Sequence, residues 1–159
     1  MILQENQIRG EKMEYDQIIE AAISAEQYAH DLYMKAHSLA KSKIAKDLLL
    51  MLAGEELTHK QALEKLYLEK KGDTEISPLQ DPLQDLGFTQ RLQLTPLNEL
   101  QELKHILKVA IEREEHERLA YQNLMKAVDD PKLKQIFEKL SMEETRHKAL
   151  LEKEFSSVI

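Results

Sequence analysis

Residues 55–65 read EELTHKQALEK, and residues 143–153 read EETRHKALLEK. The offset between the two stretches is 88 residues, and it extends well beyond them. It pairs residues of the same type in the two halves of the chain: Glu26 with Glu114, Glu56 with Glu144, His59 with His147, and Tyr33 with Tyr121. A repeat of this kind predicts two helical hairpins of similar design, related by a pseudo-twofold axis.

Four segments carry apolar residues at steps that alternate between four and three, a spacing that keeps side chains on one face of a helix. The stripes run over residues 15–40, 45–66, 103–124 and 133–151. On every stripe a carboxylate or an imidazole stands where the pattern requires an apolar core residue. These interrupting residues are Glu26, Glu56, His59, Glu114, Glu117, Glu144 and His147.

Charged groups on a core-facing stripe must be neutralised, because an unpaired buried carboxylate is very costly. The stripes hold five carboxylates and two imidazoles but no Lys or Arg, so we expect bound cations. Residues at i and i+3 share a helix face, which lets Glu56 and His59 reach one metal. Glu56 and Glu144 are the expected bridges between two metals, since each lies on a helix that also supplies a His. An oxygen-rich set with one nitrogen per metal favours iron or manganese over structural zinc.

The element boundaries follow from the stripes and from the turn and cap residues. We predict helices over residues 14–40, 42–71, 96–128 and 131–155, with an N-terminal extension over 1–12 and a crossover connection over 73–95. Thr95-Pro96 and Asp130-Pro131 are typical helix starts, and Gly72 is a plausible helix end. A short helix near residues 82–86 is compatible with the connection. The predicted fold is an all-α, single-domain, ferritin-like four-helix bundle of two hairpins with a long crossover.

Composition excludes several classes of function. The 159 residues carry a net charge of −7, which argues against a nucleic-acid partner. Cysteine is absent, so thiol catalysis and cysteine-ligated centres are excluded. No apolar run approaches the ~20 residues that span a bilayer, and the N-terminus lacks the pattern of a signal peptide. We therefore expect a cytoplasmic protein with no membrane partner.

Several other polar residues allow two interpretations. Tyr33 and Tyr121 each follow a candidate ligand by seven residues, so their hydroxyls either orient that carboxylate or lie at the rim of the core. His105, three residues after a Glu, points away from the stripe and reads as a surface group. His30, His37 and His116 have no ligand-type partner in the repeat and read the same way. The run 112–118 reads as a charged helix face on which only Glu114 and Glu117 face the core.

At these residues the chain resembles the rubrerythrin branch of the ferritin-like di-iron carboxylate superfamily, over roughly residues 14–155. Glu26 with Tyr33 resembles the first-helix motif of that family, and both Glu-x-x-His pairs match its second and fourth helices. Glu117, three residues after Glu114, is similar to the extra carboxylate of the third-helix motif. The resemblance implies two iron ions held by the seven stripe residues, with manganese or a mixed pair as the alternative. It also implies a metal that exchanges a carboxylate for a histidine as its oxidation state changes.

The function implied is a di-iron oxidoreductase that reduces hydrogen peroxide or activates dioxygen, with catalytic roles for Glu117, Tyr33 and Tyr121. Rubrerythrins carry a cysteine-ligated iron domain that delivers electrons, and this chain has no Cys, so we expect a separate electron-donor protein. We also expect a homo-oligomer, most simply a dimer. The alternative is a ferroxidase or iron-storage protein of ferritin-like type. A helical interaction module with a structural metal is a third reading, which the open, carboxylate-rich ligand set disfavours.

Overall fold

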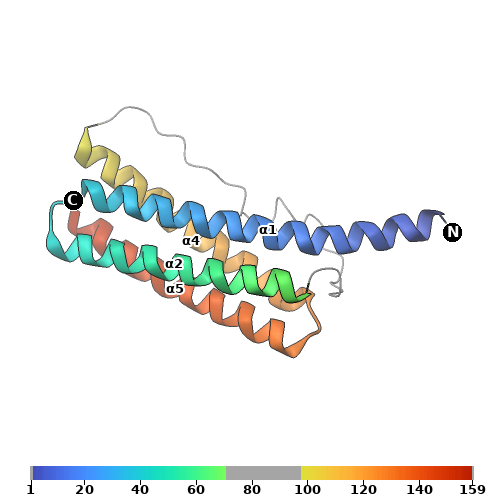
Figure 1. The fold of residues 1–159 in the computed structure, drawn as a ribbon. Coiled ribbons are helices and arrows are strands. Elements are labelled where there is room, and N and C mark those ends of the chain that lie inside the picture. Colours follow the sequence, from blue (N-terminus) through green and yellow to red (C-terminus); the bar gives the residue numbers. More distant parts are fainter. Residues whose placement is uncertain (1, 71–97, 159) are drawn as a thin grey trace.

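The computed structural model describes residues 2–70 and 98–158, which form four helices (Figure 1). They are α1 (Ile2–Leu39), α2 (Lys43–Lys70), α4 (Glu99–Ala127) and α5 (Pro131–Val158). Helix α1 packs along α2 and α4 packs along α5, so each half of the chain forms one hairpin. The hairpins associate mainly through α1 and α4, whereas α2 and α5 are less closely packed. The predicted four-helix bundle of two hairpins is confirmed.

Helix α1 begins at Ile2, so the predicted helix start near residue 14 is wrong, and most of the predicted N-terminal extension over residues 1–12 is helical. The stripe that set the predicted start begins only at Tyr15, yet the preceding residues are mostly good helix formers and include no proline. Local propensity therefore carries the helix past the end of the bundle (Figure 1). Helix α5 likewise ends at Val158, three residues later than predicted.

The repeat extends to the helix caps. Ser42 Oγ accepts a hydrogen bond from the Ala45 amide at 3.0 Å, and Asp130 Oδ1 accepts one from the Lys132 amide at 2.8 Å. Ser42 and Asp130 are related by the offset of 88, so both hairpins turn into their second helix with the same kind of cap. Helix α4 is capped by Asn98. The predicted cap at Thr95-Pro96, Gly72, the short helix and the crossover all lie outside the described residues.

The core consists of two hydrophobic clusters. The first gathers the start of the α1 stripe, the end of α2, the end of α4 and the start of α5, and includes Ile18, Leu63, Tyr121 and Phe137. The second gathers the opposite end of each helix and includes Tyr33, Leu49, Ile106 and Leu151. On every helix the charged stripe residues lie between these two clusters. The bundle therefore places a charged layer in the middle of an apolar core.

None of the helices in the described ranges combines the length and the apolar character that crossing a lipid bilayer requires.

Candidate metal centre

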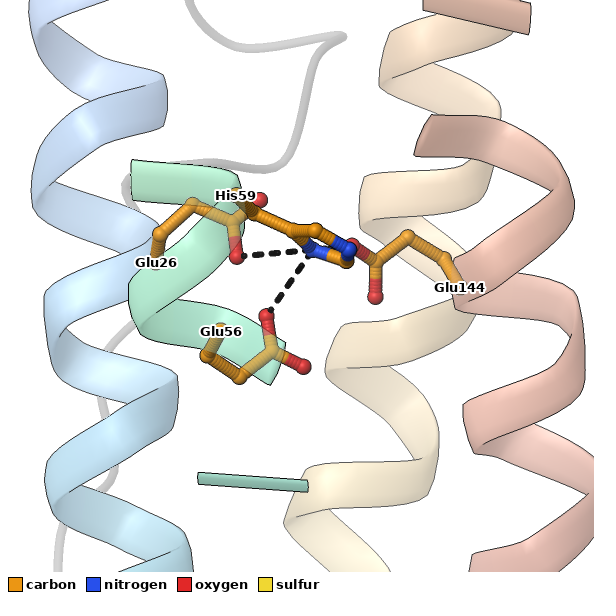
Figure 2. A group of neighbouring side chains, drawn as sticks. All are labelled: Glu26, Glu56, His59 and Glu144. Carbon is orange, nitrogen blue, oxygen red and sulfur yellow. Dashed lines mark ion pairs between the residues drawn. The ribbon is translucent and has the colours of Figure 1, made fainter. Parts of the chain in front are cut away.

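Six of the seven predicted ligands converge in the charged layer, in two groups that share Glu56 and Glu144. The first group is Glu26, Glu56, His59 and Glu144, and the second is Glu56, Glu114, Glu144 and His147. Within each group the candidate ligand atoms all lie within 4.8 Å of one another. All six side chains are buried, none more than 4% exposed. Figure 2 shows the first group, in which side chains from α1, α2 and α5 point toward one another.

The imidazole of His59 faces three carboxylates through its inner nitrogen. Nδ1 lies 3.0 Å from Glu144 Oε1, 3.4 Å from Glu56 Oε2 and 3.5 Å from Glu26 Oε2 (Figure 2). Because α1, α2 and α5 each supply one of these carboxylates, the group forms only when both hairpins are in place.

The second group repeats this geometry around His147. Its Nδ1 lies 2.8 Å from Glu56 Oε1, 3.4 Å from Glu144 Oε2 and 3.5 Å from Glu114 Oε1. Glu56 thus turns one oxygen toward each imidazole, and so does Glu144. This is the arrangement expected of two bridging carboxylates, and it places them close together at the pseudo-twofold axis as the repeat predicts.

The inner atoms of the layer lack hydrogen bonds. Both oxygens of Glu56, both oxygens of Glu144 and Nδ1 of each His have no hydrogen-bond partner among the described residues. Leaving so many buried polar atoms unsatisfied is prohibitive in an apolar core. The candidate ligand atoms of each group lie within 4.8 Å of one another, so the donor set fits two cations. Four carboxylates balance the charge of two divalent ions, and oxygen with one nitrogen per ion suits iron or manganese.

The electrostatics of the metal-free layer agree with this interpretation. Burial, followed by the charges of Glu26 and Glu114, raises the pKa of Glu56 well above its ordinary value. Burial and the charge of Glu144 raise the pKa of Glu114 in the same way. For Glu26, burial acts to raise the pKa, but contacts with Glu56 and His59 outweigh it and lower the pKa. Crowded carboxylates therefore retain protons when no cation is present.

The same crowding acts on the two imidazoles. Burial alone would lower the pKa of His59, but Glu144, Glu26 and Glu56 raise it far above its ordinary value. At His147 burial alone would also lower the pKa. The neighbouring carboxylates raise the pKa instead, and Glu114 makes the largest contribution among them. Protons thus occupy the inner nitrogens in the metal-free protein, and binding of a metal must displace them.

Each imidazole also contacts a carboxylate on the opposite hairpin through its outer nitrogen. His59 Nε2 lies 2.5 Å from Glu143 Oε2, and His147 Nε2 lies 2.7 Å from Glu55 Oε2. A carboxylate only accepts, so Nε2 donates, and Nδ1 becomes available as a ligand once its own proton is displaced. Sequence reasoning assigned no role to Glu55 and Glu143, although the repeat pairs them at the same offset and both directly precede a predicted bridge.

The two predicted tyrosines cross between the hairpins in a reciprocal way. The Tyr33 hydroxyl on α1 donates to Glu114 Oε1 on α4, and the Tyr121 hydroxyl on α4 donates to Glu26 Oε1 on α1. Both side chains are buried, so their hydroxyls do not lie at a solvent-exposed rim. Burial and nearby carboxylates raise the pKa of each tyrosine well above its ordinary value, which keeps the phenol protonated as a donor. The structure supports the interpretation that each tyrosine orients a candidate ligand.

Glu117, the seventh predicted ligand, is buried but belongs to neither group. Its Oε1 lies 3.2 Å from Nη2 of Arg113, one turn earlier on α4. Arg113 is itself only 3% exposed, so the prediction that Glu114 and Glu117 alone face the core within residues 112–118 is wrong. The sequence feature that could have identified this ion pair is the i, i+4 spacing of Arg113 and Glu117, a cation and a predicted core carboxylate.

Two histidines that were predicted to be surface groups are partly buried. His30 is half-buried, with Nδ1 3.0 Å from the Ala53 carbonyl oxygen, and His105 is half-buried as well. Neither joins the two groups of candidate ligands.

A cavity of about 360 Å³ lies between α2 and α5. His59 and Glu143 form part of its wall, together with apolar side chains such as Leu140 and Ile136. The cavity therefore reaches the outer edge of one imidazole from the less closely packed side of the bundle.

Comparison with known proteins agrees with the geometry. The family model described as rubrerythrin matches residues 17–106 and 105–158, which together span nearly all of both hairpins. A hypothetical protein from Pyrococcus furiosus has a similar structure, with a TM-score of 0.73 and 23% sequence identity, covering 90% of this chain and 89% of that one. At this identity the likeness concerns the fold alone. The comparison with curated proteins gave no match.

Proposed function

The chain belongs to the rubrerythrin family, and we propose that it is a di-iron carboxylate oxidoreductase that reduces hydrogen peroxide or activates dioxygen with electrons from a separate donor protein. The observation that carries the proposal is the set of inner carboxylate and imidazole atoms that have no hydrogen-bond partner among the described residues and that fall into two groups of candidate ligands. A structural metal site would be closed by its ligands and would not need bridging carboxylates.

In this proposal Glu26, Glu56, His59 and Glu144 would hold one iron, and Glu56, Glu114, Glu144 and His147 would hold the other. Manganese or a mixed pair would fit the same donors. The bound metals would pass electrons from the separate donor protein to the oxidant.

The protein's own groups fix the geometry of the centre. The carboxylates of Glu55 and Glu143 hold the imidazoles in the tautomer whose Nδ1 lone pair faces inward. Tyr33 and Tyr121 hold the terminal carboxylates of the opposite hairpins. The cavity between α2 and α5 gives small oxidants a path toward the layer, while the two hydrophobic clusters exclude bulk water from either side.

Anaerobic loading with ferrous iron tests the proposal. The loaded protein is expected to bind two irons per chain and to consume hydrogen peroxide stoichiometrically, and catalytically when a chemical reductant is added. The Glu56→Gln and Glu144→Gln variants serve as controls that lack a bridge.

Two outcomes contradict the proposal. Accumulation of many irons per chain in a large assembly on size exclusion would favour iron storage instead. Binding of two irons with no reaction toward peroxide or dioxygen would contradict an oxidoreductase.

A further inference from the structure

Arg113 and Glu117 form a buried ion pair beside the charged layer, in one hairpin only. Arg113 Nη2 lies 3.2 Å from Glu117 Oε1, and the two side chains are 3% and 1% exposed. The offset of 88 maps them onto Ala25 and Ala29, which are buried at the corresponding turns of α1. Both members of the pair are thus present in α4 and both are missing from α1. They are best understood as one unit added to an otherwise symmetric site.

The geometry points to Arg113 as a positioning residue that holds the Glu117 carboxylate out of the metal ligand set, leaving a centre of four carboxylates and two imidazoles. This inference rests on the proposed metal centre. It adds a residue that sets the ligand number of that centre, and it concerns binding of the metal before any reaction.

Charge balance supports the separation of Glu117 from the ligands. Glu26, Glu56, Glu114 and Glu144 carry four negative charges, which two divalent ions cancel when both imidazoles are neutral. Glu117 would add an excess negative charge in a buried layer, and Arg113 cancels that charge locally. The six-residue centre and the ion pair are therefore each neutral.

Arg113 is held in place from the opposite hairpin. Its guanidinium carbon lies 4.6 Å from the ring centroid of Tyr28 on α1, a distance at which a cation is attracted to the ring face. The second oxygen of Glu117 has no hydrogen-bond partner among the described residues. Glu117 is therefore restrained through one oxygen by Arg113, and loss of that contact leaves a buried carboxylate one turn from Glu114 with no cation except the metals.

Titration of the metal-free protein with cobalt(II), followed by visible absorption and calorimetry, tests this role without any turnover. Wild type and Glu117→Gln are expected to bind two ions with the same spectrum and with affinities within about twofold. Arg113→Met is expected to release Glu117 to the metals, to change the cobalt spectrum, and to tighten binding roughly tenfold, the range seen when groups around a metal site are altered.

The double variant Arg113→Met/Glu117→Gln separates positioning from a merely structural role. It is expected to return the spectrum and the affinity to wild-type values, because the released carboxylate is gone. Arg113→Lys keeps the charge and is expected to keep the wild-type spectrum.

Three results would overturn the inference: a changed spectrum for Glu117→Gln alone, an unchanged one for Arg113→Met, or a change that persists in the double variant. A wild-type protein that binds no cobalt would overturn both this inference and the proposed function. A wild type that binds two ions yet reacts with neither oxidant would contradict only the proposed function.

Discussion

The α1–α2 and α4–α5 hairpins differ far less in the charged layer than they do around it. Around His59 the three carboxylate contacts are 3.0, 3.4 and 3.5 Å, and around His147 they are 2.8, 3.4 and 3.5 Å. The tyrosine bonds and the outer carboxylates repeat as well. What the two hairpins share is the set of candidate ligands together with the groups that contact them.

What the hairpins do not share lies just outside that machinery. The Arg113–Glu117 pair replaces two alanines, and Arg146, whose guanidinium lies 2.5 Å from Glu55, corresponds to Thr58 in the first hairpin. We therefore infer that the repeated groups form the candidate centre, and that the unrepeated groups modify its ligand set and its surroundings. This division predicts equal effects for changes at repeat-related positions and smaller, one-sided effects elsewhere.

The largest effect is expected from removing metals from the proposed centre, whose candidate ligands come from both hairpins. The metal-free protein should melt about 10 °C lower at pH 7, since tight ligands contribute ~4 kcal/mol and each kcal/mol shifts the midpoint by ~2–4 °C. Calorimetry with and without a chelator measures this. Equal melting temperatures would show that the hairpins associate without ions.

The difference in melting temperature should depend on pH. Raised pKa values at Glu56, Glu114 and Glu117 mean that the metal-free fold binds more protons than the unfolded chain, so its stability falls as pH rises above about 4.5. The raised pKa values of the two histidines act in the same direction above about pH 6.5. The lowered pKa values of Glu26, Glu55 and Glu115 act in the opposite direction. The gain from metal should therefore be small at pH 5 and largest near pH 8.

Removing either bridge should weaken binding of the metal pair by at least ~100-fold, because each bridge serves both ions. Glu56→Gln and Glu144→Gln are expected to give the same loss in a metal titration. Glu64→Gln and Glu152→Gln, which are also related by the repeat but lie away from the layer, are matched controls. Unequal losses of affinity in the two variants would show that the two bridging positions are not equivalent.

The tyrosine substitutions Tyr33→Phe and Tyr121→Phe should each lower the free energy of unfolding of the loaded protein by about 2 kcal/mol, the value of a buried hydrogen bond to a charged group. Urea unfolding measures the difference. Tyr67→Phe is the control, because Tyr67 makes the same kind of bond to Glu20 on the surface and should cost under ~0.5 kcal/mol. A large difference between the two buried tyrosines would contradict their equivalence.

A smaller effect is expected from the outer carboxylates, which are about one-third exposed. Glu55→Gln and Glu143→Gln should each weaken metal binding roughly tenfold by loosening the imidazole that they orient. Glu138→Gln, an exposed change on α5, should have no effect. Unchanged affinity in both variants would show that the outer carboxylates do not orient the imidazoles.

The smallest effect on metal binding is expected from Glu117→Ala, since six candidate ligands remain. Its effect should appear in the reaction, with oxidation of the ferrous protein by peroxide slowed more than oxidation by dioxygen. Anaerobic stopped-flow measurements with each oxidant decide this. Equal slowing by both oxidants, or none, would mean that the unrepeated carboxylate has no role in the choice of oxidant.

The sequence predicted the features that depend on periodicity. The stripes and the offset of 88 identified the four helices and the six converging ligands, because helix phase alone decides which face each residue occupies. The start of α1 was missed because no stripe precedes Tyr15, and helix formation there depends on local propensity.

The groups that sequence reasoning missed depend on contacts between elements. Glu55 and Glu143 lie one position before the predicted bridges and so fall outside the stripes, yet each contacts an imidazole of the other hairpin. Arg113 was read as solvated because a cation on an otherwise charged run is usually exposed. Its burial follows from Tyr28 on α1 and from Glu117, and periodicity cannot reveal a contact between hairpins.

The position of the charged layer between two hydrophobic clusters has a consequence for local opening. Helices usually fray from their ends, where backbone amides exchange first with solvent. In this bundle both ends of the core are apolar clusters, whereas the middle contains buried carboxylate and imidazole atoms that lack hydrogen-bond partners among the described residues. Hydrogen exchange in the ion-free protein should therefore be fastest at mid-helix amides near Glu56 and Glu144, and slowest in the turns on either side. Binding of ions should slow exchange at these mid-helix amides and so reverse that order. Local opening of the ion-free bundle would therefore begin at its centre, and binding of ions would suppress it there.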